Sequence, residues 1–161
     1  MSYEYKGETM MDQIEKTIEE SIRELCQGED FAVLATQGND QPYTSLIGFV
    51  TTPDLKYVAF ATPKQTRKYF LLESNKRVAF MVDNRASQLG SINYISAVTI
   101  TGKARFLTEV QEEEHWGGML IEKHPYLTDF IKSSATAIVV VEVYRYFYVR
   151  RFQEVAEWVP K

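Results

Sequence analysis

The sequence has one cysteine, no long hydrophobic run and no glycine-rich phosphate loop. Cys26 is the only cysteine among 161 residues, so no intrachain disulfide can form and a reducing, cytoplasmic location is expected. No apolar run approaches the roughly 20 residues that cross a bilayer, and residues 1–7 lack the charged and then apolar layout of a signal peptide. We therefore expect no membrane partner, and no Walker or dinucleotide glycine motif is present.

Residues that bind metals or act as nucleophiles are also scarce. His115, His124 and Cys26 are the whole supply of histidine and cysteine, and their spacing suits no metal site. Cys26 lies near the end of an amphipathic segment, where a small, half-buried residue is a better interpretation than a nucleophile. The three glutamates at 112–114 fit a solvated helix face. No metal ligand and no catalytic acid–base pair is predicted.

The net charge of −4 argues against a nucleic-acid partner, which would need a broad basic face. The charge is unevenly distributed, since residues 1–30 hold nine acids and three bases. Residues 63–77 reverse this balance with five bases against Glu73 alone. Such a compact basic island suits one small anion, and a solvated helix face is the alternative interpretation.

The hydrophobic pattern predicts one domain, because no repeat or linker divides the chain. Apolar residues at spacings of three and four predict a helix from about Thr9 to Gln27. Alternating or β-rich runs predict strands over 31–36, 43–51, 55–61, 77–82, 98–106 and 137–150. Further helices are predicted over 63–74 and 108–123, the latter opened by a capping box of Thr108 and Gln111.

This order of elements predicts a mainly β fold, a six-stranded antiparallel barrel with peripheral helices. A parallel sheet is disfavoured because the early strands have no crossover helix between them. Within residues 1–161 we expect an N-terminal helix over 1–28, a barrel core over 30–150 and a C-terminal tail over 151–161.

The junction between the third strand and the next helix carries the strongest functional signal. The strand ends at Ala61, and Thr62 and Thr66 place two hydroxyls before the helix. Unpaired backbone N–H groups and the helix dipole favour an anion at such a junction. Arg67 can grip phosphate oxygens with its planar fork, and Lys68 adds a point charge. Together they predict a monophosphate site.

Several short motifs, in order, resemble the core of the pyridoxamine 5′-phosphate oxidase-like FMN-binding split barrels. These motifs are Tyr57–Thr62, Thr66–Lys68, Asn75–Phe80, Asp83–Ser87 and Val98–Ala104. The likeness covers about residues 30–107 well. Leu71 and Lys76 depart from the family, which often has Asn and Pro there, but neither position is a phosphate-binding one. The resemblance implies a split barrel, FMN as cofactor and a small-molecule substrate.

The resemblance also implies which residues bind the cofactor. Those for the phosphate and ribityl chain are Thr62, Thr66, Arg67 and Lys68. Those along the isoalloxazine ring, largely through backbone groups, are Ser45, Leu46 and Ile47, followed by Gly48, with Ala61 at the ring or ribityl edge. Asn84 and Arg85 would reach the flavin across a dimer interface, or form a simple turn. Trp158 would cover the ring, or belong to a tail packed on the barrel.

The implied function is that of an FMN-dependent oxidoreductase, in which the flavin carries the electrons and no acid or base is required. One alternative is a flavin-binding or redox-sensing module without turnover. Deazaflavin F420 would need further basic residues for its acidic tail, and haem would need His115 or His124 as an axial ligand. The segment 144–152 and the nine residues after it show no counterpart of the substrate motif of true pyridoxamine phosphate oxidases.

A homodimer is expected from the last strand. Tyr144, Tyr146 and Tyr148 fall on one face of that strand, and Phe147 and Val149 on the other. A six-stranded barrel is too small to enclose a flavin, so one face should fill the barrel and the other should pack outside it, most commonly in a two-fold contact. The interface would then form part of each flavin site. The alternative is that the N-terminal helix covers this face.

Overall fold

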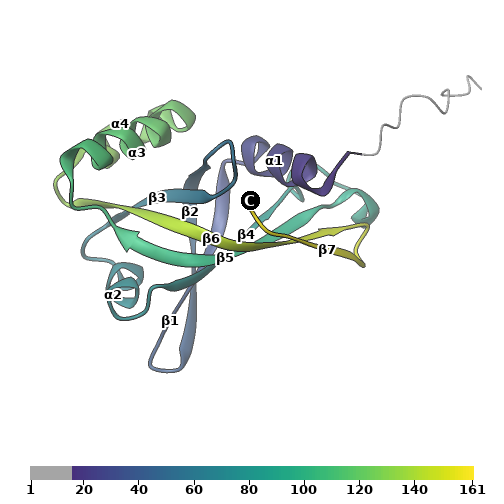
Figure 1. Cartoon of the computed structure of the whole chain (residues 1–161), viewed down its shortest axis with the longest axis horizontal. Coiled ribbons are helices and arrows are strands. Elements are labelled where there is room, and N and C mark those ends of the chain that lie inside the picture. Colours follow the sequence, from purple (N-terminus) through teal and green to yellow (C-terminus); the bar gives the residue numbers. More distant parts are fainter. Residues whose placement is uncertain (1–15) are drawn as a thin grey trace, which may run out of the picture.

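One antiparallel sheet forms the framework of the computed structural model, which describes residues 16–161. Its strand order is β3-β2-β1-β4-β5-β6-β7, and the pairing of β3 with β6 closes six of these strands into a barrel (Figure 1). The strands are β1 (Phe31–Gly38), β2 (Gln41–Thr51), β3 (Tyr57–Pro63), β4 (Arg77–Asp83), β5 (Ala97–Phe106), β6 (Thr136–Arg150) and β7 (Glu154–Trp158). The predicted mainly β barrel is confirmed, and β7 is a strand that the prediction had assigned to the tail.

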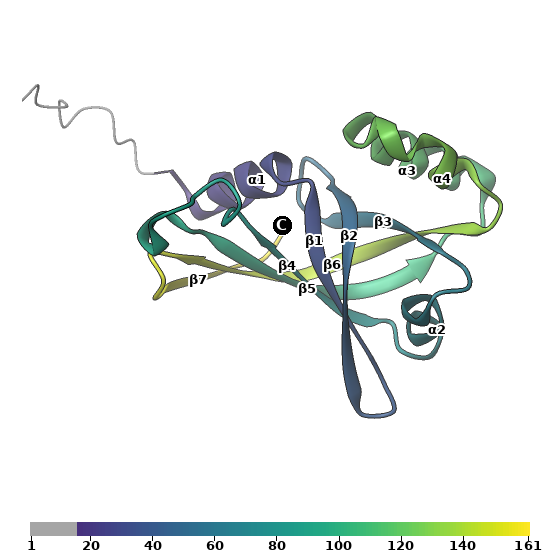
Figure 2. The same ribbon diagram turned by 180° about the vertical axis from the view of Figure 1, so that it is seen from behind.

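The hairpin of β1 and β2 extends well beyond the closed part of the barrel (Figures 1 and 2). Its turn consists of Asn39 and Asp40, whose φ angles of 51° and 57° are both positive. Two successive left-handed residues match the right-handed twist of the flanking strands, and Asn and Asp tolerate that conformation better than most side chains. The dense turn signal at 37–42 therefore marked the hairpin correctly.

A bulge in β6 changes which of its residues face the barrel interior. The register with β5 shifts between Thr101 and Gly102, where β6 contains the extra residue Tyr144. Tyr146 and Tyr148 are buried inside the barrel, but Tyr144 is 48% exposed. The expectation that the three tyrosines share one face is therefore wrong, because one extra residue reverses the alternation.

The helices lie outside the barrel. They are α1 (Ile18–Gly28), α2 (Arg67–Ser74), α3 (Val110–Lys123) and α4 (Thr128–Lys132), with 3₁₀ turns η1 (Ile92–Tyr94) and η2 (Pro125–Leu127). α1 begins after a capping box of Thr17 and Glu20, and residues 9–15 of the predicted helix lie outside the described residues. α2 begins later than predicted because Pro63 still belongs to β3. Neither η2 nor α4 was predicted.

The predicted capping box of Thr108 and Gln111 is wrong. α3 takes Glu109 as its N-cap, one residue later, and no side chain caps that end. Thr108 consequently lies before the cap, too early to accept from the first-turn N–H groups. The predicted C-terminal end near Lys123 is correct.

Two apolar clusters hold these layers together. One fills the barrel and continues under α1 through Ile22, Leu25 and Cys26. The other joins the outer face of β3 and β6 to α3 and α4, with Leu120 and Ile131 among its buried members. Burial of this size is the main driving force for folding. No helix within the described part of the chain is both long and apolar enough to cross a membrane.

Cys26 is fully buried rather than half-buried. Burial raises the pKa of its thiol to about 12. Lys123 from α3 donates hydrogen bonds to the carbonyl oxygens of Cys26 (2.9 Å) and Glu29 (2.8 Å), which satisfies the last carbonyls of α1. This lysine thus ties the end of α1 to α3.

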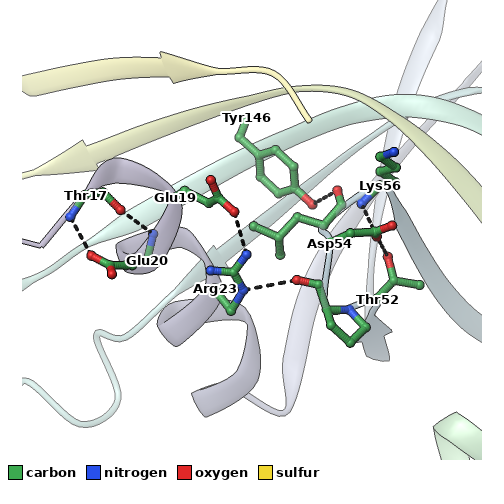
Figure 3. Close-up of polar contacts among 10 residues, drawn as sticks. Thr17, Glu19, Glu20, Arg23, Thr52, Asp54, Lys56 and Tyr146 are labelled. Carbon is green, nitrogen blue, oxygen red and sulfur yellow. Dashed lines mark hydrogen bonds and ion pairs between the residues drawn. The ribbon is translucent and has the colours of Figure 1, made fainter. Parts of the chain in front are cut away.

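The turn between β2 and β3 is clamped from two sides (Figure 3). Leu55 is fully buried with a φ of 61°, and its carbonyl oxygen accepts a 2.7 Å hydrogen bond from the Tyr146 hydroxyl. Arg23 of α1 donates to the carbonyl oxygen of Pro53 at 3.1 Å. The hydroxyl of Thr52, which donates to the Asp54 carboxylate at 2.6 Å, holds the pKa of that carboxyl below its usual range.

Candidate functional site

A pocket of about 220 Å³ lies outside the barrel, between the outer face of β2 and β3 and the α3–α4 layer. Figure 2 shows β3 running between α2 on one side and α3 and α4 on the other, with β2 next to it. Four residues predicted to bind the cofactor line the pocket, namely Leu46, Ile47, Ala61 and Lys68. Its remaining walls are Phe31, Gly48, Pro63, Leu120, Leu127, Phe130 and Ile131. The structure therefore brings both predicted strand segments and one predicted cation to one apolar pocket.

The β2 segment presents different atoms to the two sides of the sheet. Leu46 points outward and is 68% exposed at the pocket. Ser45 pairs with buried Leu34, so its side chain faces the barrel, and its Oγ is the one buried side-chain polar atom without a hydrogen bond among the described residues. Gly48 leaves room beside the His124 ring, which lies 3.5 Å from where a Cβ would be. Leu46 and Gly48 both line the pocket, with the His124 ring packed beside Gly48.

Thr62 and Thr66 form a pair of hydrogen-bonded hydroxyls at the start of α2. Their hydroxyl oxygens lie 3.0 Å apart, and the Thr66 hydroxyl donates to the carbonyl oxygen of Pro63 at 2.9 Å. The Thr62 hydroxyl can donate to the Thr66 oxygen or to the carbonyl oxygen of Pro63, which lies 3.4 Å away. Thr66 also caps the helix by accepting from the backbone N–H of Tyr69 (3.4 Å). Thr62 is fully buried, so in this arrangement both threonines position the helix end.

The first turn of α2 offers the groups that can meet an anion. The backbone N–H groups of Arg67 and Lys68 are at the first two helical positions, where no intrahelical acceptor exists. Lys68 is partly buried, and this burial lowers the pKa of its ammonium group. Among residues 16–161, none forms a hydrogen bond or an ion pair with the Lys68 ammonium group. A partly buried cation without a counter-charge favours an anionic ligand.

Arg67 is exposed, and its guanidinium carbon lies 5.4 Å from the centre of the Tyr43 ring. This cation–π contact holds the side chain against the β1–β2 hairpin without using its hydrogen-bond donors on another side chain. Tyr43 was not predicted to belong to the site, and only its position in the hairpin, opposite buried Thr36, brings it there.

His124 is a residue of this region that the sequence did not single out as part of a flavin site. Its ring is fully buried, and Nε2 lies 2.9 Å from the carbonyl oxygen of Phe49. Since a carbonyl oxygen only accepts, Nε2 carries the proton, and Nδ1 is left to accept from the Tyr126 hydroxyl at 3.4 Å. His124 thus fixes the β2 backbone next to Gly48.

Three predicted site residues lie elsewhere in the chain. Asn84 accepts a 2.8 Å hydrogen bond from the backbone N–H of Ser96 and so closes the loop after β4. Arg85 lies 3.2 Å from the Asp83 carboxylate. Trp158 belongs to β7, where its ring packs 5.6 Å from that of Tyr146. Their predicted contacts with the flavin stay predictions.

Within residues 16–161, no group of three or more His, Cys, Asp or Glu side chains is placed to hold a metal ion.

Comparisons with known proteins bear on the family and the fold of the chain. A family model described as pyridoxamine 5′-phosphate oxidase matches residues 18–149. No curated protein matches the chain by sequence.

Solved structures of similar fold share little sequence with the chain. A heme binding protein from Mycobacterium smegmatis has a TM-score of 0.80 at 13% identity, with 91% of this chain and 60% of that chain covered. The General Stress Protein 26 from Bacillus anthracis has a TM-score of 0.65 at 16% identity, with 88% and 97% covered. A FAD-binding protein from Mesorhizobium loti has a TM-score of 0.60 at 16% identity, with 78% and 88% covered. The chain thus spans about 60% of the mycobacterial protein, and these likenesses concern the fold alone.

Proposed function

The chain belongs to the pyridoxamine 5′-phosphate oxidase family, and from that premise we propose that it is an FMN-binding oxidoreductase acting on a small molecule. The observation that carries this proposal is the Lys68 ammonium group, partly buried at the apolar pocket and without a counter-charge among residues 16–161. A phosphate group at this position would supply the missing negative charge. The free N–H groups at the start of α2 would add hydrogen bonds to it.

The residues present fit FMN in both chemistry and shape. Lys68, Arg67 and the backbone N–H groups of the first α2 turn would hold the phosphate. The flat, apolar stretch around Leu46 and Gly48 would support the isoalloxazine ring and exclude water from one face of it. Bound FMN would supply the electron transfer itself, and the chain would bind, orient and shield the ring.

The geometry favours a flavin over the alternatives. Both nitrogens of His124 are engaged inside the protein, so this histidine has no free position for an axial haem bond. His115 is an exposed residue of α3 and does not line the pocket. For F420, the acidic tail would need cations beyond the phosphate group. Of the residues lining this pocket, Lys68 is the only cation.

We propose further that the protein is a homodimer in which the second chain completes each site. A pocket of about 220 Å³ is smaller than the roughly 300–1,000 Å³ of most ligand pockets, so one chain supplies only part of the enclosure. A row of side chains crosses the outer face of the sheet next to it, because residues paired in register share a face. This row consists of Leu46, Val33, Met81, Thr99 and Phe147. A largely apolar row across five strands is suited to a two-fold contact.

Light scattering tests this dimer, with an expected mass of twice 18.6 kDa. A monomer that still binds FMN tightly would contradict it.

A cytoplasmic location is proposed as well, because the single thiol needs no oxidising compartment.

An absorption spectrum of freshly purified protein tests the cofactor class. Paired flavin bands are expected, whereas a Soret band or a single deazaflavin band would contradict the proposal. Oxidoreductase activity is tested separately by reducing the bound flavin and following its reoxidation by candidate substrates. We expect one substrate molecule to be consumed for each flavin reoxidised. If no candidate substrate is consumed as the flavin is reoxidised, the protein is instead a binding module without turnover.

A further inference from the structure

We propose a second small-molecule site, which takes a planar aromatic amine, on the side of α3 away from the flavin pocket. A cavity of about 650 Å³ lies between α3, the C-terminal end of α4 and the start of β6. The two helices lie beside one another over the start of β6 (Figure 1). Its volume is within the range of sites for small organic ligands. Only Ile131 lines both cavities, so the second site does not depend on FMN binding.

A pair of glycines forms the floor of this cavity. Gly117 and Gly118 are adjacent in the middle of α3, where glycine is destabilising relative to alanine. Gly117 has a packing reason, because a Cβ there would approach Ile138 Cδ1 at 3.3 Å and Ile131 Cγ2 at 3.5 Å. Gly118 has none, since nothing lies within 4 Å of the position of a Cβ. Its effect is to expose a flat stretch of helix backbone to the cavity, and a planar ring can lie against such a surface.

The walls next to this floor are apolar, and they favour a ligand that carries an aromatic ring. Val110 and Ile121 lie on the same face of α3 as the glycines, and Ile131 and Ile138 close the opposite side. The spacing of these α3 residues is that of one helix face. An aromatic ring placed there would bury apolar surface on both sides, as it does in most ligand sites.

The charges at the rim indicate an amine. Glu113 and Glu114 lie one helical turn before the glycines and line the cavity. Within the described part of the chain, neither carboxylate has a hydrogen bond or an ion pair. Lys64, on the other rim, is engaged, since its ammonium group donates to the carbonyl oxygen of Ser134 at 2.9 Å. Lys132, at the end of α4, is the second cation of the lining and likewise has no hydrogen bond or ion pair among residues 16–161, so two unpaired carboxylates stand against one unpaired ammonium group. The unpaired carboxylates beside the ring floor therefore favour a ligand with an amino group.

The test uses tryptamine and indole-3-propionate, which share a ring but carry opposite charges. Binding to the full-length protein is measured by calorimetry, with and without saturating FMN. We expect one tryptamine per chain in both conditions and weaker binding of indole-3-propionate. The double variant E113Q/E114Q should weaken tryptamine about two- to fivefold, as expected for exposed charge pairs, and should strengthen indole-3-propionate, because the repulsion between like charges is removed.

The variant Gly118→Leu places a side chain in the cavity and should weaken tryptamine by at least about tenfold. It should fold, because leucine favours a helix over glycine and meets open space. Gly28→Leu is the matched control, since Gly28 ends α1 and also has open space around its Cβ position. The site is refuted if Gly118→Leu binds tryptamine like the wild type, or if the wild type does not bind it. Equal affinity for both probes would refute the amine assignment, and FMN titration of the same samples reports on the flavin site independently.

Discussion

Replacing Lys68 with methionine is expected to have opposite effects on the free protein and on FMN binding. The ammonium group of Lys68 is partly buried, and this burial lowers its pKa. The charged form is therefore disfavoured in the free protein. Methionine keeps most of the side-chain length and removes the charge, so the variant without ligand should be at least as stable as the wild type. In the complex, the same change removes a cation from the phosphate.

The expected loss follows from the surroundings of Lys68. No residue within 16–161 pairs with its ammonium group, so a phosphate would gain the whole charge-assisted contact rather than replace another partner. Such a contact contributes about 1.5–3 kcal/mol. Lys68→Met should thus weaken FMN binding roughly ten- to a hundredfold. Riboflavin, which has no phosphate, should bind both proteins equally.

Quenching of flavin fluorescence measures the four affinities, and thermal unfolding measures the stability of the free proteins. Lys64→Met is the matched control, because Lys64 lies on the same β3–α2 connection but its ammonium group is bound to the carbonyl oxygen of Ser134. The preference of the wild type for FMN over riboflavin should also decline as the pH rises through the pKa of Lys68. Because that pKa is lowered, the decline should begin below the pH at which an ordinary lysine loses its proton. Equal FMN affinities for Lys68→Met and Lys64→Met would refute the reasoning.

Three further results are expected. Arg67→Ala should weaken FMN binding more than Lys64→Ala does in the same titration, because Arg67 stands at the helix start with free donors; equal and small effects would favour a solvated helix face. Tyr146→Phe should lower the unfolding free energy in urea by about 1–3 kcal/mol, since the buried carbonyl oxygen of Leu55 loses its 2.7 Å donor, and an unchanged midpoint would show that this bond is not needed. Cys26 should react with a thiol reagent only on unfolding. Burial raises the folded pKa of its thiol to about 12, above the roughly 9 of an exposed thiol, so its contribution to stability should be complete below about pH 9 and be lost as the pH rises towards 12; rapid labelling of the native protein would contradict this.

Local patterns identified most of the fold. β5 alternates apolar and polar residues from Val98 onward, and the turn at 39–40 carries residues that tolerate a positive φ, so both were predictable. The start of α3 was not predictable, because Thr108 and Gln111 have the spacing of a capping box although the helix takes Glu109 as its N-cap. The bulge at Tyr144 was missed for a different reason. It depends on Gly102 in the neighbouring strand, where any Cβ would collide with the carbonyl oxygen of Glu142.

The candidate site divides in the same way. Thr66, Arg67 and Lys68 are consecutive, so the short-range features of the strand–helix junction were enough to predict an anion site. The role of Thr62 needed the structure, which shows its hydroxyl bonded to that of Thr66. The far wall of the pocket comes from residues 120–131, which are distant in sequence, and from short helices that leave no clear pattern. Only the closed barrel brings that wall opposite β2.

The most direct test of the account compares the affinities of the wild-type protein for FMN and riboflavin. The two ligands share the isoalloxazine ring and the ribityl chain and differ only in the phosphate. If Lys68 and the start of α2 bind that phosphate, FMN should bind roughly tenfold or more tightly than riboflavin, since one charge-assisted contact alone accounts for that factor. Equal affinities, or binding of neither ligand, would contradict the assignment of this pocket to FMN.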